Sequence, residues 1–138
     1  MVPEMGRDAD RGAARGAEDG SAVVDFVLVS VLVVVLLLGV VQVVLALHVR
    51  AVVIDSAAEG ARLAGRADRT PADGVERTQQ LIDAAISERF AQDVTAREVE
   101  LGGMPVVEVT VTAPFPVIGL LGPAGTLTVS GHALEEEP

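Results

Sequence analysis

The longest apolar run of the chain lies near its N-terminus, from Phe26 to Leu47. Only Ser30, Gly39 and Gln42 interrupt it with mildly polar or small residues. At about 1.5 Å per residue, the run makes roughly 33 Å of helix, which is enough to span a bilayer. A small domain has no interior that could surround such a helix. We therefore predict a transmembrane helix and not a buried core helix.

The helical pattern continues beyond the apolar run to about Gly65, because apolar and small residues recur at spacings of three and four. These residues are Val49, Val52, Val53, Ala57, Gly60, Leu63 and Ala64. Small residues at Ala57, Ala61 and Gly65 allow another helix or a sheet to approach closely. They face either another subunit or the chain's own outer domain, and we favour the domain because an amphipathic stripe usually faces its own core. Glu59 and Arg62 predict a solvated ion pair.

A second helix is predicted from a start signal at Thr70, Pro71 and Asp73. Threonine suits the N-cap, proline suits the first helical position, and an acid three residues after the cap completes a capping box. The apolar spacing extends this helix to about Ala91. Its buried side is expected to hold Val75, Ile82, Ala85, Ile86 and Phe90, and Gln79 in part.

Apolar and polar residues then alternate on both sides of Gly102 and Gly103, which predicts a β-hairpin with a two-residue turn. The apolar positions are Val99 and Leu101 before the turn and Val107, Val109 and Val111 after it. A third strand is predicted around Leu127 and Val129. The apolar Val117–Leu121 segment either docks on the long helix or binds a partner, and we favour docking because exposed apolar patches are uncommon on lone domains.

The predicted fold is α+β. It has a long N-terminal transmembrane helix extended beyond the membrane, one further helix, and a small antiparallel sheet of about three strands. The corresponding regions are a leader over residues 1–20, the long helix over 21–69 and an outer domain over 70–138.

Charge and composition limit the classes of function that the chain can have. The 138 residues include 20 acids and 10 basic residues, and the net charge of −10 argues against a nucleic-acid partner. The absence of cysteine excludes disulfides and thiolate sites. The two histidines, His48 and His132, stand outside any nucleophile, metal-ligand or phosphate-binding motif. We expect no enzyme, no cofactor, no metal and no small-molecule substrate.

The leader, Met1–Gly20, is polar and has no apolar periodicity, so we expect a tail and not a folded segment. The apolar run is too long for a cleaved secretory signal, which has about 7–15 apolar residues, so it stays on the mature chain. Arginines are balanced on the two sides of the span, and the large C-terminal part is translocated largely regardless of charge. We expect a single-pass protein of the cell membrane with a cytoplasmic N-terminus and an extracytoplasmic C-terminal domain.

Asp25 is an acid at the edge of the apolar run. It lies either at headgroup level, where the dipole of the helix N-terminus favours an acid, or in a pair with a cation from another subunit. A charge held at the membrane centre costs about 2.5–3.5 kcal/mol, and less near the interface.

Two short motifs resemble a known family. Gly20 and Ser21, followed at the fifth position after the glycine by Asp25 and then by the aliphatic run, resemble the processing site of type IV pilin-like proteins. In those proteins a prepilin peptidase cuts after the glycine. The second motif is similar to the stretch after the membrane helix in TadE-like proteins of the tight-adherence (Flp) pilus apparatus, and it consists of Ala57, Ala58, Glu59, Gly60, Ala61 and Arg62. The family usually carries Glu where this chain has Asp25, which is one methylene shorter.

The resemblance implies a minor pilin or pseudopilin that joins a Flp-type pilus or related secretion system after cleavage by a prepilin peptidase. Its implied partners are the membrane, the peptidase and other pilins or pilus-assembly subunits. Cleavage would expose the amine of Ser21, and Asp25 of one subunit could neutralise that amine on the next. By itself Gly20 is equally an ordinary glycine of a flexible tail. The alternative function is an uncleaved single-pass envelope protein whose outer domain binds a partner.

Overall fold

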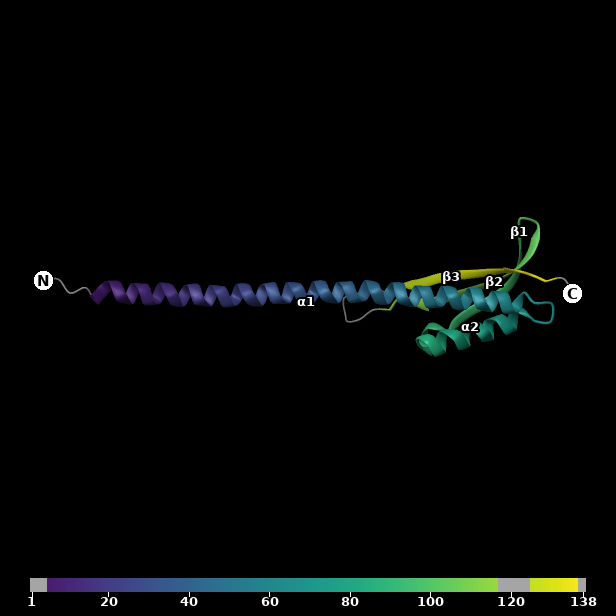
Figure 1. The fold of residues 1–138 in the computed structure, drawn as a ribbon, viewed down its shortest axis with the longest axis horizontal. Helices are drawn as coiled ribbons and strands as arrows, with labels where there is room; N and C mark the ends of the chain where they lie inside the picture. The colour runs from purple at the N-terminus through teal and green to yellow at the C-terminus, as the bar shows by residue number, and fades with distance from the viewer. Residues whose placement is uncertain (1–4, 117–124, 137–138) are drawn as a thin grey trace. The chain divides into compact units, whose positions relative to one another are not determined.

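The computed structural model describes residues 5–116 and 125–136, with side chains described from residue 18 onward. The elements in chain order are α1 (Met5–Ala64), α2 (Pro71–Ala85), the 3₁₀ helix η1 (Glu88–Phe90), β1 (Asp93–Leu101), β2 (Met104–Pro114) and β3 (Thr126–Leu134) (Figure 1). The chain divides after Val41 into two compact units. The α+β prediction is confirmed. The Val117–Leu121 segment lies outside the described residues.

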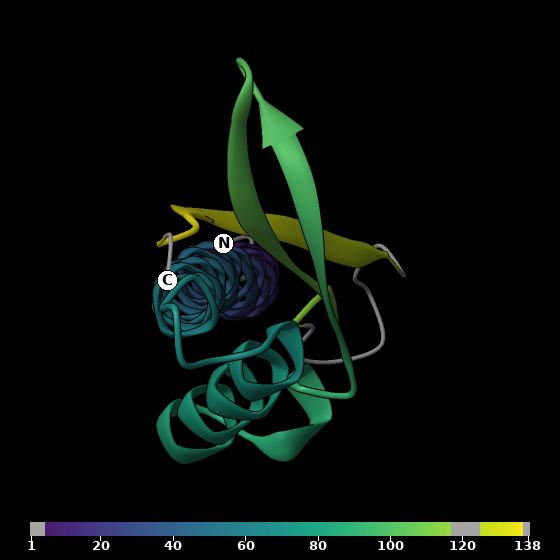
Figure 2. The ribbon, with the colours of Figure 1, turned by 90° about the vertical axis from the view of Figure 1, so that its right-hand side faces the viewer.

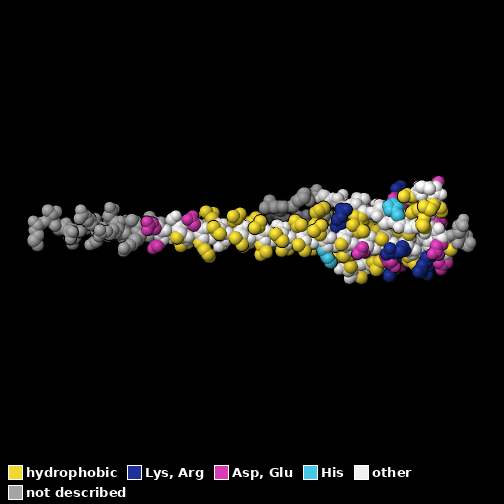
Figure 3. All heavy atoms as spheres, turned by 45° about the horizontal axis from the view of Figure 1, so that its top comes forward, with side chains coloured by type: hydrophobic (Ala, Val, Ile, Leu, Met, Phe, Trp, Pro, Cys, Tyr) yellow, Lys and Arg dark blue, Asp and Glu magenta, His cyan; other side chains and the backbone are white. Residues whose placement is uncertain are grey.

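The first unit contains most of the apolar stretch of α1. Within α1, Glu18–Ala64 is long and apolar enough to cross a membrane, and none of its most apolar window is buried inside the protein. The exposed fraction of the side chains is, for example, 73% at Phe26 and 62% at Leu47. Beyond the acidic side chains at its start, this part of the helix carries a continuous run of apolar side chains (Figure 3). So much apolar surface is unfavourable in water, and α1 therefore anchors the protein in a membrane.

The helix α1 begins at Met5, so residues 5–20 are helical where the sequence predicted an unfolded tail. The leader contains several Ala, Arg and Glu residues, which are strong helix formers. It also adjoins a helix that is already nucleated, and adding residues to a helix costs far less than starting one. The absence of an apolar stripe therefore did not prevent local helix formation.

The second unit contains a three-stranded antiparallel sheet in the order β1-β2-β3. Gly102 and Gly103 connect β1 to β2 with φ angles of 61° and 81°, and Leu101 lies opposite Met104. Positive φ at both central residues is typical of a type I′ hairpin turn, which favours glycine. The predicted hairpin and third strand are confirmed.

The core of this unit lies between one face of the sheet and the helices. From α1 it receives Val49, Val53, Ala57 and Ala61, and from the other elements Ile82, Phe90, Ala91, Val94, Val109, Val111, Ala113, Leu127 and Val129. In the sheet, Val94, Val111 and Val129 lie side by side in register. Burying a Val or Leu side chain stabilises a fold by about 1.5–3 kcal/mol, so these residues bind the outer part of α1 to the sheet. The stripe predicted on α1 faces the chain's own domain, as we favoured.

The helix α2 starts as predicted. The backbone N–H of Thr70 donates to Asp73 Oδ2 at 2.7 Å, and the N–H of Asp73 donates to Thr70 Oγ1 at 3.4 Å, which completes the capping box. This pair also lowers the pKa of Asp73, chiefly through the hydrogen bond from the Thr70 backbone.

The helix α2 ends at Ala85, whereas the sequence predicted about Ala91. Ser87 accepts a hydrogen bond from the Arg89 N–H at 3.4 Å and starts η1. A serine side chain that bonds to nearby backbone offers an alternative to continued α-helix. Phe90 is buried as predicted, but from η1, and Ala85 is exposed, contrary to prediction.

Candidate functional site

The predicted processing segment lies on α1, where Gly20, Ser21 and Asp25 are all exposed. Ser21 and Asp25 are four residues apart and therefore share one face of the helix. A Cβ atom added to Gly20 would meet nothing within 4 Å, so packing within the protein does not require glycine there. What the glycine provides is conformational freedom, because glycine destabilises a helix by about 0.5–1 kcal/mol relative to alanine and so eases local unwinding.

Asp25 stands directly before Phe26 at the start of the membrane stretch. Among the described side chains, no ion pair involves Asp25. A carboxylate at the edge of the hydrocarbon region is stabilised by a cation close by. The partner for this charge would therefore come from outside the described part of the chain.

The second predicted motif, Ala57–Arg62, divides into an inward and an outward side. Ala57 and Ala61 are fully buried and Gly60 is buried. Glu59 and Arg62 point outward, where Arg62 Nη2 lies 3.1 Å from Glu59 Oε2. The predicted ion pair is confirmed, and such an exposed pair contributes a few tenths of a kcal/mol. The small residues therefore make the packing contacts of the motif.

The inward side packs against β3 at Gly131. A Cβ atom at Gly131 would lie 2.5 Å from both Ala57 C and Ala58 N, which are backbone atoms of α1. Glycine in a strand commonly marks a close approach of another backbone. Only a glycine in β3 opposite a small residue in α1 allows this distance.

The inward side also packs against α2. A Cβ atom at Gly60 would overlap Thr78 Oγ1 and lie 2.6 Å from Gly74 O. The hydroxyl of the fully buried Thr78 lies 2.8 Å from Gly74 O and 3.3 Å from Ser56 O, so it has acceptors on both helices. We call the contact of Ala57, Gly60 and Ala61 with Gly74, Thr78 and Gly131 the small-residue junction. It fixes α2 and β3 to α1.

The sequence predicts the α1 half of this junction but not the half on α2 and β3. Gly74 lies inside α2 and Gly131 lies inside β3. A glycine inside a helix or a strand is a signal of close packing. Thr78 carries no such signal, because a threonine in an amphipathic helix does not reveal that its hydroxyl is buried.

The opposite face of the sheet is polar. Arg97, Glu108 and His132 lie side by side on the three strands. Arg97 Nη2 is 2.6 Å and His132 Nε2 is 2.8 Å from the Glu108 carboxylate. The hydrogen bonds from Arg97 and then His132 lower the pKa of Glu108 below its ordinary value of 4.5. These three side chains therefore connect the three strands across the exposed face of the sheet.

Replacing Glu108 by glutamine is expected to make the free energy of unfolding fall less steeply as the pH is lowered. Because the folded-state pKa of Glu108 is lowered, its contribution is present above the unfolded-state value and is lost as the pH falls below about 4.5. At pH 7 the variant should lose less than about 1 kcal/mol, since Arg97 is largely exposed. Urea unfolding in detergent from pH 7 to about pH 3 measures both effects. Glu98→Gln is the control, and an equal acid slope in E108Q and wild type would contradict the prediction.

Among the described residues, no group of three or more His, Asp or Glu side chains could hold a metal ion.

Comparison with known proteins finds a family match over the same segments. Residues 20–62 match the family model described as TadE-like protein. The match starts at Gly20 and ends at Arg62, so it includes both predicted motifs and the apolar stretch between them. No curated protein and no solved structure matches the chain. The family match confirms the resemblance inferred from the two motifs: over residues 20–62 the chain is similar to the TadE-like proteins.

Proposed function

We propose that this TadE-like protein is a minor pilin or pseudopilin that takes part in the assembly of a Flp-type pilus or related secretion system. The TadE-like family has a role in Tad pilus systems and is a structural family, not an enzyme family. The observation that carries the proposal is the composition of α1. Within α1, Gly20 and Asp25 precede an apolar stretch that the protein leaves uncovered, and the family match begins at that glycine.

The proposed sequence of events starts with insertion of α1 so that residues 70–138 lie outside the cytoplasm. A prepilin peptidase then cuts after Gly20. Removal of residues 1–20 takes away three Arg and five acids, which changes the net charge from −10 to −8. The new amine of Ser21 lies on the same helical face as Asp25, about 6 Å along the axis. In a staggered assembly, Asp25 of one subunit neutralises the Ser21 amine of the next.

N-terminal sequencing of the protein extracted from membranes tests the cleavage. A mature start at Ser21 is expected. An intact start at Met1, in cells with an active prepilin peptidase, would overturn the pilin proposal. It would favour instead an uncleaved, membrane-anchored envelope protein whose outer domain binds a partner.

Replacing Asp25 by alanine is expected to leave membrane insertion intact and to weaken assembly by at least about a hundredfold, because a buried charge left without its partner costs about 3–5 kcal/mol. Removal of the acid makes the helix more apolar, so insertion has no reason to fail. Co-purification of the variant with the other pilus subunits, relative to its amount in the membrane, gives the measurement.

Asp25→Glu is the matched control, since it keeps the charge and lengthens the side chain to that of the usual family residue. It should assemble at least as well as wild type. Normal incorporation of the alanine variant would remove the pairing from the mechanism and leave cleavage unaffected.

A further inference from the structure

Arginines outnumber acids around one groove of this acidic chain, whose lining includes the acids Glu59 and Glu136. Four of its ten arginines border a groove of about 850 Å³, with Arg62, Arg66 and Arg69 at the end of α1 and after it, and Arg77 on α2. Leu63, Ala133 and Leu134 supply apolar lining. We call this surface the arginine groove.

Two of these guanidinium groups lack an anionic partner in the described part of the protein. Arg62 pairs with Glu59, and Arg69 lies 3.8 Å from Asp68. Among the described residues, no ion pair or side-chain hydrogen bond involves Arg66 or Arg77. Both are exposed, so they are available to external carboxylates.

The openness of the groove favours a protein surface over a small anion. The Arg62 side chain is 65% exposed, and an anion resting on such arginines would stay in water, where an ion pair gains about 0–1 kcal/mol. A protein surface that covers the groove removes that water and lowers the local dielectric, which strengthens each charge pair. Leu134, at 60% exposed, would be buried by the same contact.

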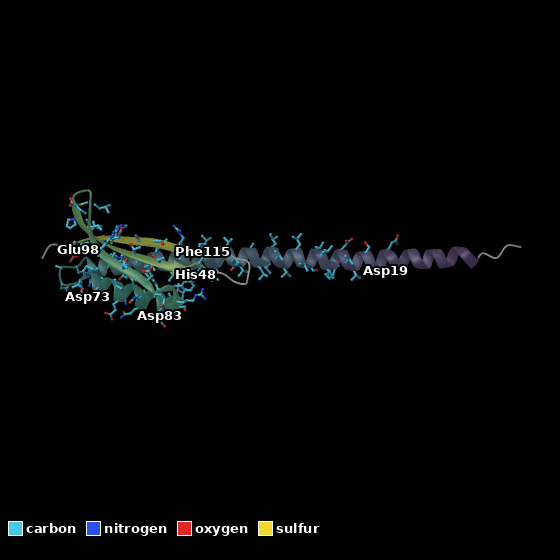
Figure 4. All side chains as sticks on the ribbon, turned by 180° about the vertical axis from the view of Figure 1, so that it is seen from behind. Asp19, His48, Asp73, Asp83, Glu98 and Phe115 are labelled. Carbon is cyan, nitrogen blue, oxygen red and sulfur yellow. The ribbon has the colours of Figure 1, made fainter. Side chains whose placement is uncertain are left out.

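This chain itself carries a complementary surface at the end of the β1–β2 hairpin. Glu98 and Glu100 are exposed and form no ion pair among the described residues. On the opposite face of the hairpin, the paired residues Leu101 and Met104 are 53% and 52% exposed. The hairpin extends away from α2 and from the end of α1 (Figure 2), and Glu98 lies on it (Figure 4). We call these four residues the acidic hairpin end.

The two surfaces lie at the same end of the second unit. The Glu135 N–H donates to Pro105 O at 3.1 Å, and the Glu136 N–H donates to Gly65 O at 2.7 Å. The C-terminal segment therefore runs from the hairpin to the end of α1. Asp73, at the start of α2, lies at this end together with Glu98, whereas Asp83 lies at the opposite end of α2 (Figure 4). Copies whose second units stand parallel therefore hold the groove and the hairpin end at the same level along that unit.

We propose that the acidic hairpin end of one copy of this chain docks in the arginine groove of a second copy. The hairpin enters the groove end-on, so that Glu98 and Glu100 on one face meet Arg66 and Arg77, while Leu101 and Met104 on the other face cover the apolar lining. The contact joins two different surfaces, so it is heterologous and can propagate from copy to copy into an open array. The inference rests on the proposed function, because membrane anchoring in an assembly is what aligns the copies.

Cysteine cross-linking in the membrane tests the contact directly. The natural chain has no cysteine, so each introduced thiol is unique. Full-length Arg77→Cys and Glu100→Cys subunits, co-expressed and oxidised, are expected to give a dimer band at least tenfold stronger than either variant alone. Asp83→Cys with Glu100→Cys is the matched control, because Asp83 is also exposed on α2 but lies away from the groove. A yield equal to that of the control pair would overturn the proposal.

Charge reversal tests its chemistry with a reporter pair, Leu63→Cys and Met104→Cys. In this background, either R66E/R77E or E98R/E100R in every subunit is expected to reduce the cross-link at least tenfold. Mixing the two reversed subunits should restore it, since each surface again meets an opposite charge. A yield that is unchanged by reversal, or is lost without rescue, would overturn the charge pairing.

The N-terminus of the same membrane preparations separates this inference from the proposed function. A Ser21 start with no specific cross-link overturns the docking and leaves the pilin proposal in place. A Met1 start with the specific cross-link overturns processing and leaves the docking in place.

Discussion

Replacing Gly131 by alanine is expected to lower the free energy of unfolding of the outer domain by about 3 kcal/mol, the upper end of the usual range for overpacking. The added Cβ atom would lie 2.5 Å from backbone atoms of Ala57 and Ala58. A side-chain obstacle can rotate away, but a backbone obstacle forces α1 and β3 apart. That separation would open the buried contacts of Ala57, Val129 and their neighbours.

Urea unfolding of the full-length protein in detergent, followed by circular dichroism, measures this loss. Gly125→Ala is the matched control, because a Cβ there meets nothing within 4 Å. Its effect should stay within about 0.5 kcal/mol. Gly60→Ala should also destabilise, since its Cβ would overlap Thr78 Oγ1 and displace a buried hydroxyl from its acceptors. If Gly131→Ala unfolded like Gly125→Ala, the packing of β3 on α1 would be wrong.

Local chemistry made much of the fold predictable from the sequence. The Gly102–Gly103 turn needs positive φ, and glycine supplies it, so the hairpin follows from two residues. The start of α2 follows from the reciprocal hydrogen bonds of Thr70 and Asp73. Its end does not, because apolar spacing continues through Ile86 to Phe90 while Ser87 changes the backbone to a 3₁₀ turn. The helical leader was missed because apolar periodicity says nothing about a helix extended from a neighbour.

The candidate site is likewise predictable from the sequence only where it depends on a single element. The small residues of α1 are visible as a stripe, but Gly74 and Gly131 become their partners only through tertiary contact. The arginine groove is likewise absent from any sequence window, since Arg66 follows α1, Arg77 belongs to α2 and Leu134 belongs to β3. Spacing along one element predicts a face, and only packing decides what that face meets.

Replacing Gly20 by valine is expected to abolish removal of the leader. Gly20 lies within α1, so a peptidase that binds an extended segment must first unwind the helix there. Glycine lowers that cost by about 0.5–1 kcal/mol relative to alanine and offers no side chain to clash with an active site. Valine places two methyl groups on a stiff Cβ at the scissile position. The protein should therefore keep the mobility of the uncleaved chain on gels, and wild type should run faster with a Ser21 start.

Gly16→Val separates the scissile position from a general effect on the leader helix. Gly16 also lies on α1, and a Cβ at either glycine meets nothing within 4 Å, so neither substitution disturbs packing. Valine is no better a helix former than the average residue, and its effect on the helix should be similar at the two sites. If only Gly20→Val stays uncleaved, the peptidase reads the residue at the junction with Ser21. Cleavage of both variants would contradict the assignment of Gly20, and failure of both would move the requirement to the helix. The comparison therefore tests whether Gly20 is a recognition residue or a glycine of an ordinary leader, which the sequence leaves open.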